Sequence, residues 1–215
     1  MYRNQVIILE NKVIKKFSRE KDFLTELKGR QIFSDRWNVP QLIGINNQKL
    51  TVEYERINAS TLAEKIDALS LDKIKQYISK IESKGLEKEI ELRDYSEALT
   101  ILPPRFSDRV RIKPETVVHG DFRPYNILEG DTLIDFEFVH NGIVEEDLAK
   151  FYIETLSLNP RLAHEMHEYA KVRDYHTFLF HCLLIGCTQL ETGFYSRNNI
   201  SNFIMQVKEE IKRVM

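Results

Sequence analysis

The spacing of apolar residues along the chain changes at about residue 57. Before that point, short β-branched runs are separated by turn residues, which is typical of strands joined by hairpins. After it, apolar residues such as Leu62, Ile66 and Leu69 recur at intervals of three and four, the period of an amphipathic helix. The pattern predicts an α+β protein, with strands at residues 5–10, 13–17 and 49–54 and later helices at residues 60–81, 147–156, 160–171, 175–193 and 201–215.

One helix is predicted within the strand-rich part of the chain. Ser18 is a suitable N-cap, because its hydroxyl accepts a hydrogen bond from the first turn. Gly29 is a suitable stop, because glycine adopts the conformation that ends many helices. The apolar face of this helix is expected to consist of Phe23, Leu24 and Leu27.

A polar run between apolar segments holds the candidate chemistry. It reads His119-Gly120-Asp121-Phe122-Arg123-Pro124-Tyr125-Asn126, and two short strands at residues 127–128 and 133–134 follow around a turn at residues 129–131. Such a hairpin brings Asn126 and Asp135 to the same end, because one strand leaves where the other returns, with Asp121 across the loop. Oxygen atoms of this kind suit Mg²⁺. The spacing therefore indicates a metal-assisted phosphoryl transfer.

Composition narrows the classes of protein to consider. The 215 residues are 42% hydrophobic, which is enough for a packed core. The net charge is −2, so we expect no nucleic-acid partner. Cys182 and Cys187 lie in an apolar stretch and are expected to be reduced thiols. No signal peptide or membrane-spanning run is recognisable, so the expected location is cytoplasmic.

The spacing of the central run resembles a kinase catalytic loop. An Asn follows the His-x-Asp aspartate by five residues, and Asp-Phe follows that Asn by nine. Within the protein-kinase-like phosphotransferases, the chain is similar to the aminoglycoside phosphotransferase and choline kinase group, which typically reads His-Gly-Asp and Asp-Phe-Glu at these places. The resemblance implies a protein-kinase-like fold, with an abbreviated β-rich N-lobe at residues 1–57 and a mainly helical C-lobe at residues 58–215.

The resemblance also implies a reaction and roles for residues in the central run. The reaction is transfer of the γ-phosphoryl group of ATP to a hydroxyl of a small molecule that is aminoglycoside-, choline- or sugar-like. Asp121 is the expected catalytic carboxylate, and Arg123 is expected to hold γ-phosphoryl oxygens. Asn126 and Asp135 are the expected ligands of the cofactor Mg²⁺. Two residues are expected to support the loop, namely His119 and Asp147.

The phosphate-binding lysine is expected on the second strand. Val13-Ile14-Lys15 resembles the end of the kinase Val-Ala-Ile-Lys strand, and strand alternation places Lys15 on the same side as Val13. Lys16 is the alternative. The resemblance implies that a helix glutamate pairs with this lysine, and Glu20 is the expected partner, with Glu26 as the runner-up.

The adenine of ATP is expected to lie among apolar side chains and beside the backbone that joins the two lobes. The expected apolar residues are Val13, Leu128 and Ile134. The expected backbone neighbours at the hinge are Glu53, Tyr54 and Glu55. The acceptor is not identified by the sequence.

The chain departs from the kinase pattern near its start. About a dozen residues precede Lys15, and none of them is glycine, so we expect the backbone cradle over the phosphates to be truncated or supplied by another part of the chain. Two alternatives stay open. One, which fits the short N-lobe and the total length, is a compact macromolecule-directed atypical kinase of the lipopolysaccharide-sugar or tRNA-modification-associated type. The other is a nucleotide-binding pseudokinase module that has lost efficient catalysis.

The segment at residues 96–115 comes directly before the central run. Its basic residues are Arg105, Arg109, Arg111 and Lys113. They form either a solvated face or a site for an anionic acceptor.

Overall fold

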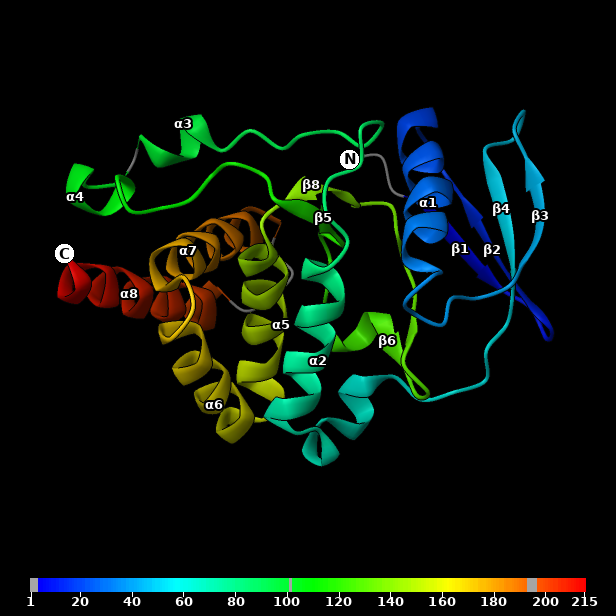
Figure 1. Cartoon of the computed structure of the whole chain (residues 1–215). Helices are drawn as coiled ribbons and strands as arrows, with labels where there is room; N and C mark the ends of the chain where they lie inside the picture. The colour runs from blue at the N-terminus through cyan, green and yellow to red at the C-terminus, as the bar shows by residue number, and fades with distance from the viewer. Residues whose placement is uncertain (1–3, 101, 193–196) are drawn as a thin grey trace. The chain divides into compact units, whose positions relative to one another are not determined.

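The structure is a computed structural model that describes residues 4–100, 102–192 and 197–215. The chain forms two compact units (Figure 1). The first contains the chain up to Ala68 together with His119–Val139, and the second contains Leu69–Val118 together with His140–Met215. The predicted α+β class is confirmed, because an antiparallel sheet lies in the first unit and helices dominate the second.

A four-stranded antiparallel sheet forms the base of the first unit, in the order β1-β2-β4-β3. Its strands are β1 (Gln5–Ile8), β2 (Lys12–Lys16), β3 (Leu42–Asn46) and β4 (Thr51–Glu55) (Figure 1). The predicted first hairpin is confirmed, with Ile8 opposite Val13. The sheet and helix α1 (Glu20–Phe33) share a small core, in which Phe17 and Val52 pack with Phe23.

Helix α1 begins and ends later than predicted. Its N-cap residue is Arg19, and it continues through Gly29 to Phe33. A Cβ atom at Gly29 would lie 2.6 Å from Cγ2 of Val139 and 2.9 Å from Cβ of Phe136, so glycine is needed here for close packing and does not end the helix. The predicted apolar face is also partly wrong, since Leu24 is 54% exposed. The buried residues of α1 are Phe23, Glu26, Gly29 and Phe33.

The predicted central hairpin is confirmed and belongs to the first unit. It consists of η2 (Pro124–Asn126), β6 (Ile127–Leu128) and β7 (Thr132–Leu133). Backbone hydrogen bonds tie it to earlier parts of the chain, from Leu133 N to Asn38 O at 2.8 Å and from Glu129 N to Ser60 O at 2.9 Å. The second bond explains why the segment that includes η1 (Leu62–Ala68) packs in this unit. The lobe boundary expected after Ile57 stays a prediction.

The second unit is mainly helical. Its elements are α2 (Leu71–Glu82), α3 (Ser96–Leu99), α4 (Pro104–Ser107), β5 (Thr116–Val118), β8 (His140–Gly142), α5 (Val144–Leu158), α6 (Pro160–Lys171), α7 (Tyr175–Thr192) and α8 (Arg197–Val214) (Figure 1). Helix α6 has the predicted bounds, whereas α5 begins three residues before the predicted start. The predicted end at Gly193 lies outside the described residues. Among the helices that the structure describes, none is long and apolar enough to cross a membrane.

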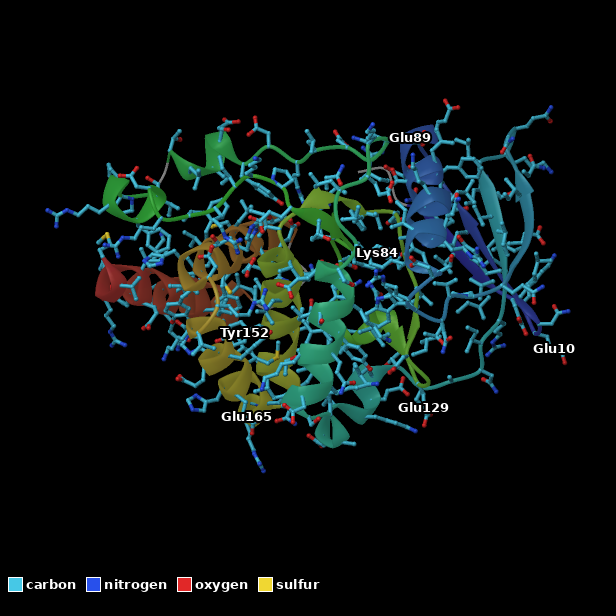
Figure 2. All side chains as sticks on the ribbon, in the orientation of Figure 1. Glu10, Lys84, Glu89, Glu129, Tyr152 and Glu165 are labelled. Carbon is cyan, nitrogen blue, oxygen red and sulfur yellow. The ribbon has the colours of Figure 1, made fainter. Side chains whose placement is uncertain are left out.

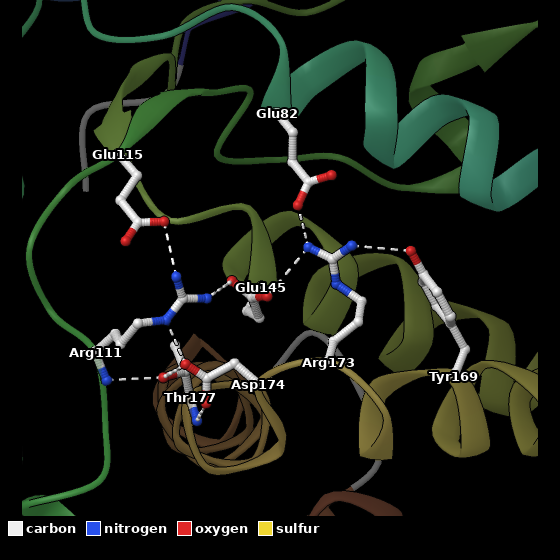
Figure 3. A network of polar contacts seen from close by, with 8 residues as sticks. All are labelled: Glu82, Arg111, Glu115, Glu145, Tyr169, Arg173, Asp174 and Thr177. Carbon is white, nitrogen blue, oxygen red and sulfur yellow. Dashed lines mark hydrogen bonds and ion pairs between the residues drawn. The ribbon is translucent and has the colours of Figure 1, made fainter.

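A network of charged side chains joins the basic segment to the helices of the second unit (Figure 3). The Arg111 guanidinium contacts Asp174 at 2.5 Å, Glu115 at 2.8 Å and Glu145 at 3.2 Å. Arg173 contacts the same Glu145 at 3.3 Å. Since three carboxylates surround Arg111, its charge is already compensated, and it does not favour an anionic acceptor at this place.

Candidate active site

Lys15 on β2 lies at the centre of the candidate site. Its side chain is buried, because strand alternation turns Lys15 inward beside Phe17 and leaves Lys16 exposed. The Nζ atom lies 2.7 Å from Oε2 of Glu26 and 2.6 Å from Oδ1 of Asp135. Burial lowers the pKa of Lys15, but these two carboxylates raise it to a net value above the usual one. The amine is therefore held as a cation.

The expected pairing of Lys15 with Glu20 is wrong. Glu20 is exposed in the first turn of α1, and the runner-up Glu26 makes the contact instead. Six helical residues rotate Glu26 by about 120° relative to Glu20, at roughly 100° per residue. That rotation places Glu26 on the buried face with Gly29, the face that α1 turns toward its neighbours in this unit.

The Glu26 carboxylate accepts hydrogen bonds on both oxygens. Oε2 accepts from Lys15 and also from the backbone N–H of Phe136 at 2.9 Å. Oε1 accepts from the Tyr54 hydroxyl at 2.9 Å. Burial raises the pKa of Glu26, and although the charge of Lys15 and the hydrogen bonds of Lys15 and Tyr54 oppose this rise, the net pKa lies above the usual value. These three hydrogen bonds offset part of the cost of burying the Glu26 carboxylate.

The side chain of Tyr54 is a participant that the sequence analysis missed. It was expected only as a backbone neighbour of the nucleotide, together with Glu53 and Glu55. On β4, Val52 and Tyr54 point into the core, while Glu53 points away and pairs with Lys12 at 2.7 Å. Strand alternation was the signal available in the sequence, because it places these two residues on the face opposite Glu53.

The loop before the central hairpin holds a second carboxylate. Asp121 is mostly buried and accepts a hydrogen bond at 2.8 Å from Nδ2 of Asn126, which also donates to the Asp121 carbonyl at 2.9 Å. Nε of Arg123 lies 3.0 Å from Oδ2 of Asp121. A hydrogen bond from Asn126 and an ion pair with Arg123 therefore hold the Asp121 carboxylate at a defined place in the loop.

His119 ties this loop to the hairpin. Its Nε2 donates to the carbonyl of Ile134 at 3.0 Å, and its Nδ1 accepts from the Asp121 N–H at 3.4 Å. Burial lowers the pKa of His119, against the opposing charges of Asp121 and Asp135. A neutral, fully buried imidazole with both nitrogens engaged fits a structural donor better than a general base.

Asp135 follows the second strand of the hairpin in a left-handed backbone conformation, with φ at +71°. Aspartate tolerates this region better than most residues. Burial raises the pKa of Asp135, and the charge and hydrogen bond of Lys15 outweigh this effect, so the net pKa lies below the usual value. The carboxylate is thus held ionised, which a metal ligand requires.

One cavity of about 400 Å³ is lined by part of this site, and its polar lining includes Lys15, Glu26, Asn126 and Asp135. Asp121, Arg123 and His119 are not among its lining residues. Its apolar lining includes the three expected residues Val13, Leu128 and Ile134, together with Val6 and Ile8 of β1, which the sequence analysis did not identify. Tyr54 and Glu55 line it as well, and Glu53 does not. The volume and the mixed lining are those of a small-molecule site.

The protein oxygen atoms in this cavity can hold Mg²⁺ only together with oxygen atoms of a bound phosphate compound. Among the described residues, no three His, Cys, Asp or Glu side chains gather to hold a metal ion. Asn126 and Asp135, which line one cavity, offer an amide oxygen and a carboxylate. Mg²⁺ is commonly bound by one or two protein oxygens, with phosphate oxygens and water completing its shell. The residues therefore fit a metal that arrives with a phosphate compound.

Two further expectations concern the edges of the site. Asp147 is fully buried near the start of α5, in the second unit, and its support of the loop stays a prediction. The turn between β1 and β2 closes with a hydrogen bond from Leu9 N to Lys12 O at 2.8 Å. It carries the exposed Glu10 and no glycine (Figure 2).

Comparison with known proteins identifies the family. No curated protein sequence matches the chain significantly. Among solved structures, a choline/ethanolamine kinase family protein from Mesorhizobium loti aligns with a TM-score of 0.63 and 15% identity, over 96% of this chain and 84% of that one. Choline kinase LicA from Streptococcus pneumoniae aligns with a TM-score of 0.63 and 16% identity, over 98% of this chain and 90% of that one.

A third solved structure, the gentamicin complex of APH(2″)-IIa, aligns with a TM-score of 0.61 and 12% identity, over 97% of this chain and 87% of that one. At these identities the likeness shows a shared fold. The model of the phosphotransferase enzyme family matches residues 34–180, which is more than half of the sequence. This chain therefore belongs to the phosphotransferase enzyme family.

Proposed function

We propose that the chain is a magnesium-dependent kinase that transfers the γ-phosphoryl group of ATP to a hydroxyl of a small molecule. One observation carries this proposal. A single cavity contains a buried lysine, two oxygen-bearing side chains suited to Mg²⁺ and an apolar wall, the last formed in part by Val13 and Ile134. Positioning and charge neutralisation are the main requirements of phosphoryl transfer, and these groups supply both.

In this proposal, the residues that line the cavity bind the two ends of the nucleotide. The adenine ring packs among Val6, Ile8, Val13, Leu128 and Ile134. Lys15 binds the α- and β-phosphates while Glu26 keeps its ammonium in place. Support comes from relatives in the same structural group that were solved with ADP or with AMP-PNP.

The metal site is formed by Asn126 and Asp135. When bound, Mg²⁺ supplies neutralisation of the charge that develops on the oxygen between the β- and γ-phosphates. Lys15 contacts one oxygen of the Asp135 carboxylate, Oδ1, so the other oxygen would be available to hold the metal. Glu26 would keep the Lys15 ammonium beside the phosphates.

Asp121 orients the acceptor. Its carboxylate accepts a hydrogen bond from the acceptor hydroxyl, and the acceptor oxygen forms a bond to the γ-phosphorus as the bond to the bridging oxygen breaks. ADP leaves with the electron pair, and the hydroxyl proton passes to Asp121 and then to water. Arg123, adjacent to Asp121, binds the transferred phosphoryl oxygens. A loose transition state needs little proton removal early, so an ordinary carboxylate suffices.

The proposed class of acceptor is based on the substrates named for proteins of similar structure. These proteins include choline kinases and enzymes solved with gentamicin or with hygromycin B. These are small molecules, and we propose a small hydroxylated acceptor of aminoglycoside, choline or sugar type for this chain, with the reaction in the cytoplasm where ATP is available.

A nucleotide-binding module without efficient catalysis is the second candidate. It is favoured by the β1–β2 turn, which has no glycine to bring backbone N–H groups close to the phosphates. The test is a screen of hydroxylated metabolites for Mg-dependent ATP consumption, together with a thermal shift by Mg-ATP. Turnover with one acceptor class supports the kinase, and a thermal shift without any turnover supports the module. Absence of both would overturn the proposed nucleotide site.

A further inference from the structure

The Tyr54 hydroxyl forms a hydrogen bond with Glu26, the glutamate that contacts Lys15. It donates to Oε1 of Glu26 at 2.9 Å, in a place where the tyrosine is 5% exposed and the glutamate 1%. The two side chains come from different elements, β4 and α1. This hydrogen bond therefore fixes the helix glutamate against the sheet.

The three hydrogen bonds of Glu26 are divided unequally between its oxygens. Oε2 accepts from both Lys15 and the Phe136 N–H, whereas the structure describes one donor to Oε1, the Tyr54 hydroxyl. A carboxylate that loses this donor leaves one buried oxygen unsatisfied. It then relieves the cost by rotating, and rotation displaces the oxygen that holds Lys15.

The ring of Tyr54 is well suited to hold a fixed position. It packs in the core with Phe17, Phe23 and Val52, so its two side-chain torsions are set by packing. The packed ring fixes the position of the hydroxyl, so the hydrogen bond to Glu26 costs little additional side-chain conformational entropy. A flexible donor such as lysine would not fix the carboxylate equally well.

Lys15 has two carboxylate partners, and one of them, Asp135, is also the proposed metal ligand. Asp135 competes with Glu26 for the same ammonium at nearly equal distance, 2.6 Å against 2.7 Å. With Asp135 as a metal ligand, Glu26 would be the partner that keeps Lys15 beside the phosphates. Glu26 also binds the N–H of Phe136, the residue directly after Asp135, so its position affects the metal ligand as well.

We infer that Tyr54 is a positioning residue, whose hydroxyl orients the Glu26 carboxylate so that Glu26 holds both Lys15 and the backbone next to Asp135. This inference rests on the proposed function and deepens it. The Tyr54 hydroxyl acts through its hydrogen bond to Glu26, and in this way it positions the proposed phosphate-binding amine of Lys15 and the backbone next to the proposed metal ligand Asp135.

The test is a double-mutant cycle with Tyr54→Phe, Glu26→Gln and the combined variant, assayed for Mg-dependent phosphoryl transfer and for Mg-ATP affinity by calorimetry. Phenylalanine keeps the packed ring and removes only the hydroxyl. We expect Tyr54→Phe to lower kcat/KM about tenfold, and Glu26→Gln to lower it by about a hundredfold. The combined variant should match Glu26→Gln alone, because Tyr54 acts through that carboxylate.

Tyr175→Phe is the matched control. It removes a hydroxyl that donates to a carboxylate at 3.0 Å, that of Glu210, within the second unit. It should leave kcat/KM unchanged. Circular dichroism at the assay temperature establishes that each variant is folded, and Glu26→Asp replaces Glu26→Gln if the latter does not fold.

The outcomes separate this inference from the proposed function. Equal kcat/KM for Tyr54→Phe and wild type, or losses that simply multiply in the combined variant, would overturn the role of Tyr54 while leaving the kinase intact. A similar loss in Tyr175→Phe would also overturn it, by showing a general structural effect. A wild-type chain that neither consumes ATP nor binds Mg-ATP removes the proposed function, and the inference with it.

Discussion

Lys15 and Asp135 are 120 residues apart in the sequence, yet Nζ of one lies 2.6 Å from Oδ1 of the other. The contact joins the inner face of the N-terminal sheet to the end of the central hairpin. It also places an ammonium on the carboxylate that we propose as a magnesium ligand. Variants of residues at this contact test the roles proposed for them.

Replacing Asp135 by asparagine should weaken binding of Mg-ATP at least tenfold in titration calorimetry, because a neutral amide is a poorer magnesium ligand. Asparagine tolerates the left-handed backbone that residue 135 adopts, so the fold should persist. Asp131→Asn is a matched control, since Asp131 also has a positive φ, in the turn of the same hairpin. Equal affinity in Asp135→Asn and wild type would contradict the metal role.

Asp121→Asn should abolish phosphoryl transfer, with kcat at least about a thousandfold lower, and should leave Mg-ATP affinity nearly unchanged. The amide keeps the size of the carboxylate but cannot accept the hydroxyl proton. The control is Asp72→Asn, on the exposed first turn of α2. Retained turnover in Asp121→Asn would end the catalytic assignment.

Two glutamates of α1 provide a paired test of the lysine contact. Glu26→Gln should lower kcat/KM markedly, because a neutral side chain no longer holds the Lys15 ammonium in place. Glu20→Gln should have no effect, since Glu20 is exposed on the same helix. Steady-state kinetics at varied ATP distinguishes the two variants, and the reverse order of effects would show that the side-chain pairing described here is not the functional one.

Gly29→Ala should destabilise the chain by about 1–3 kcal/mol, because a methyl group there would overlap Val139 and Phe136. At Gly44 the nearest atom to an added Cβ is 3.9 Å away, so Gly44→Ala should cost little. Urea unfolding of both variants measures the difference. Similar midpoints would mean that the approach of α1 to residues 136–139 is looser than described.

Acid should destabilise the second unit through His181. Burial lowers the pKa of this imidazole to about 4, from 6.5, although Glu146 opposes the shift. The unfolded chain protonates this histidine near pH 6.5, whereas the folded chain protonates it only near pH 4. The free energy of unfolding is therefore unaffected by His181 above about pH 6.5 and falls as the pH is lowered toward 4. Between these pH values the free energy of unfolding should fall by roughly 1.4 kcal/mol per pH unit.

Urea unfolding at several pH values tests this statement. His181→Phe should flatten the dependence between pH 6.5 and 4, while His164→Phe, at an exposed position of α6, should keep it. An unchanged slope in His181→Phe would assign the acid sensitivity to other groups.

The parts of the site that follow from local spacing were predictable. Strand alternation placed Lys15 inward, and the length of the central hairpin brought Asn126 and Asp135 to one cavity. The choice between Glu20 and Glu26 was not predictable in this way, because it depends on the rotation of α1. That rotation is set by packing at Gly29, which the sequence presents only as a glycine in a helical pattern.

The grouping of the chain into units was also beyond local patterns. Residues 119–139 join the N-terminal sheet through long-range contacts, such as the hydrogen bond from Leu133 to Asn38. No periodicity within either segment encodes such a pairing. The contribution of the Tyr54 hydroxyl is of the same kind, since its partner Glu26 lies 28 residues earlier in the chain.

The amide of Asn126 has a consequence for the timing of the proposed reaction. Its nitrogen is committed to Asp121, and its residue lines the nucleotide cavity, so its oxygen is the atom left for a cation. The two ends of a planar amide cannot move independently. In the proposed reaction, a cation bound to that oxygen would fix the orientation of the amide that donates to Asp121, so a misplaced nucleotide would also misorient the carboxylate that receives the acceptor hydroxyl.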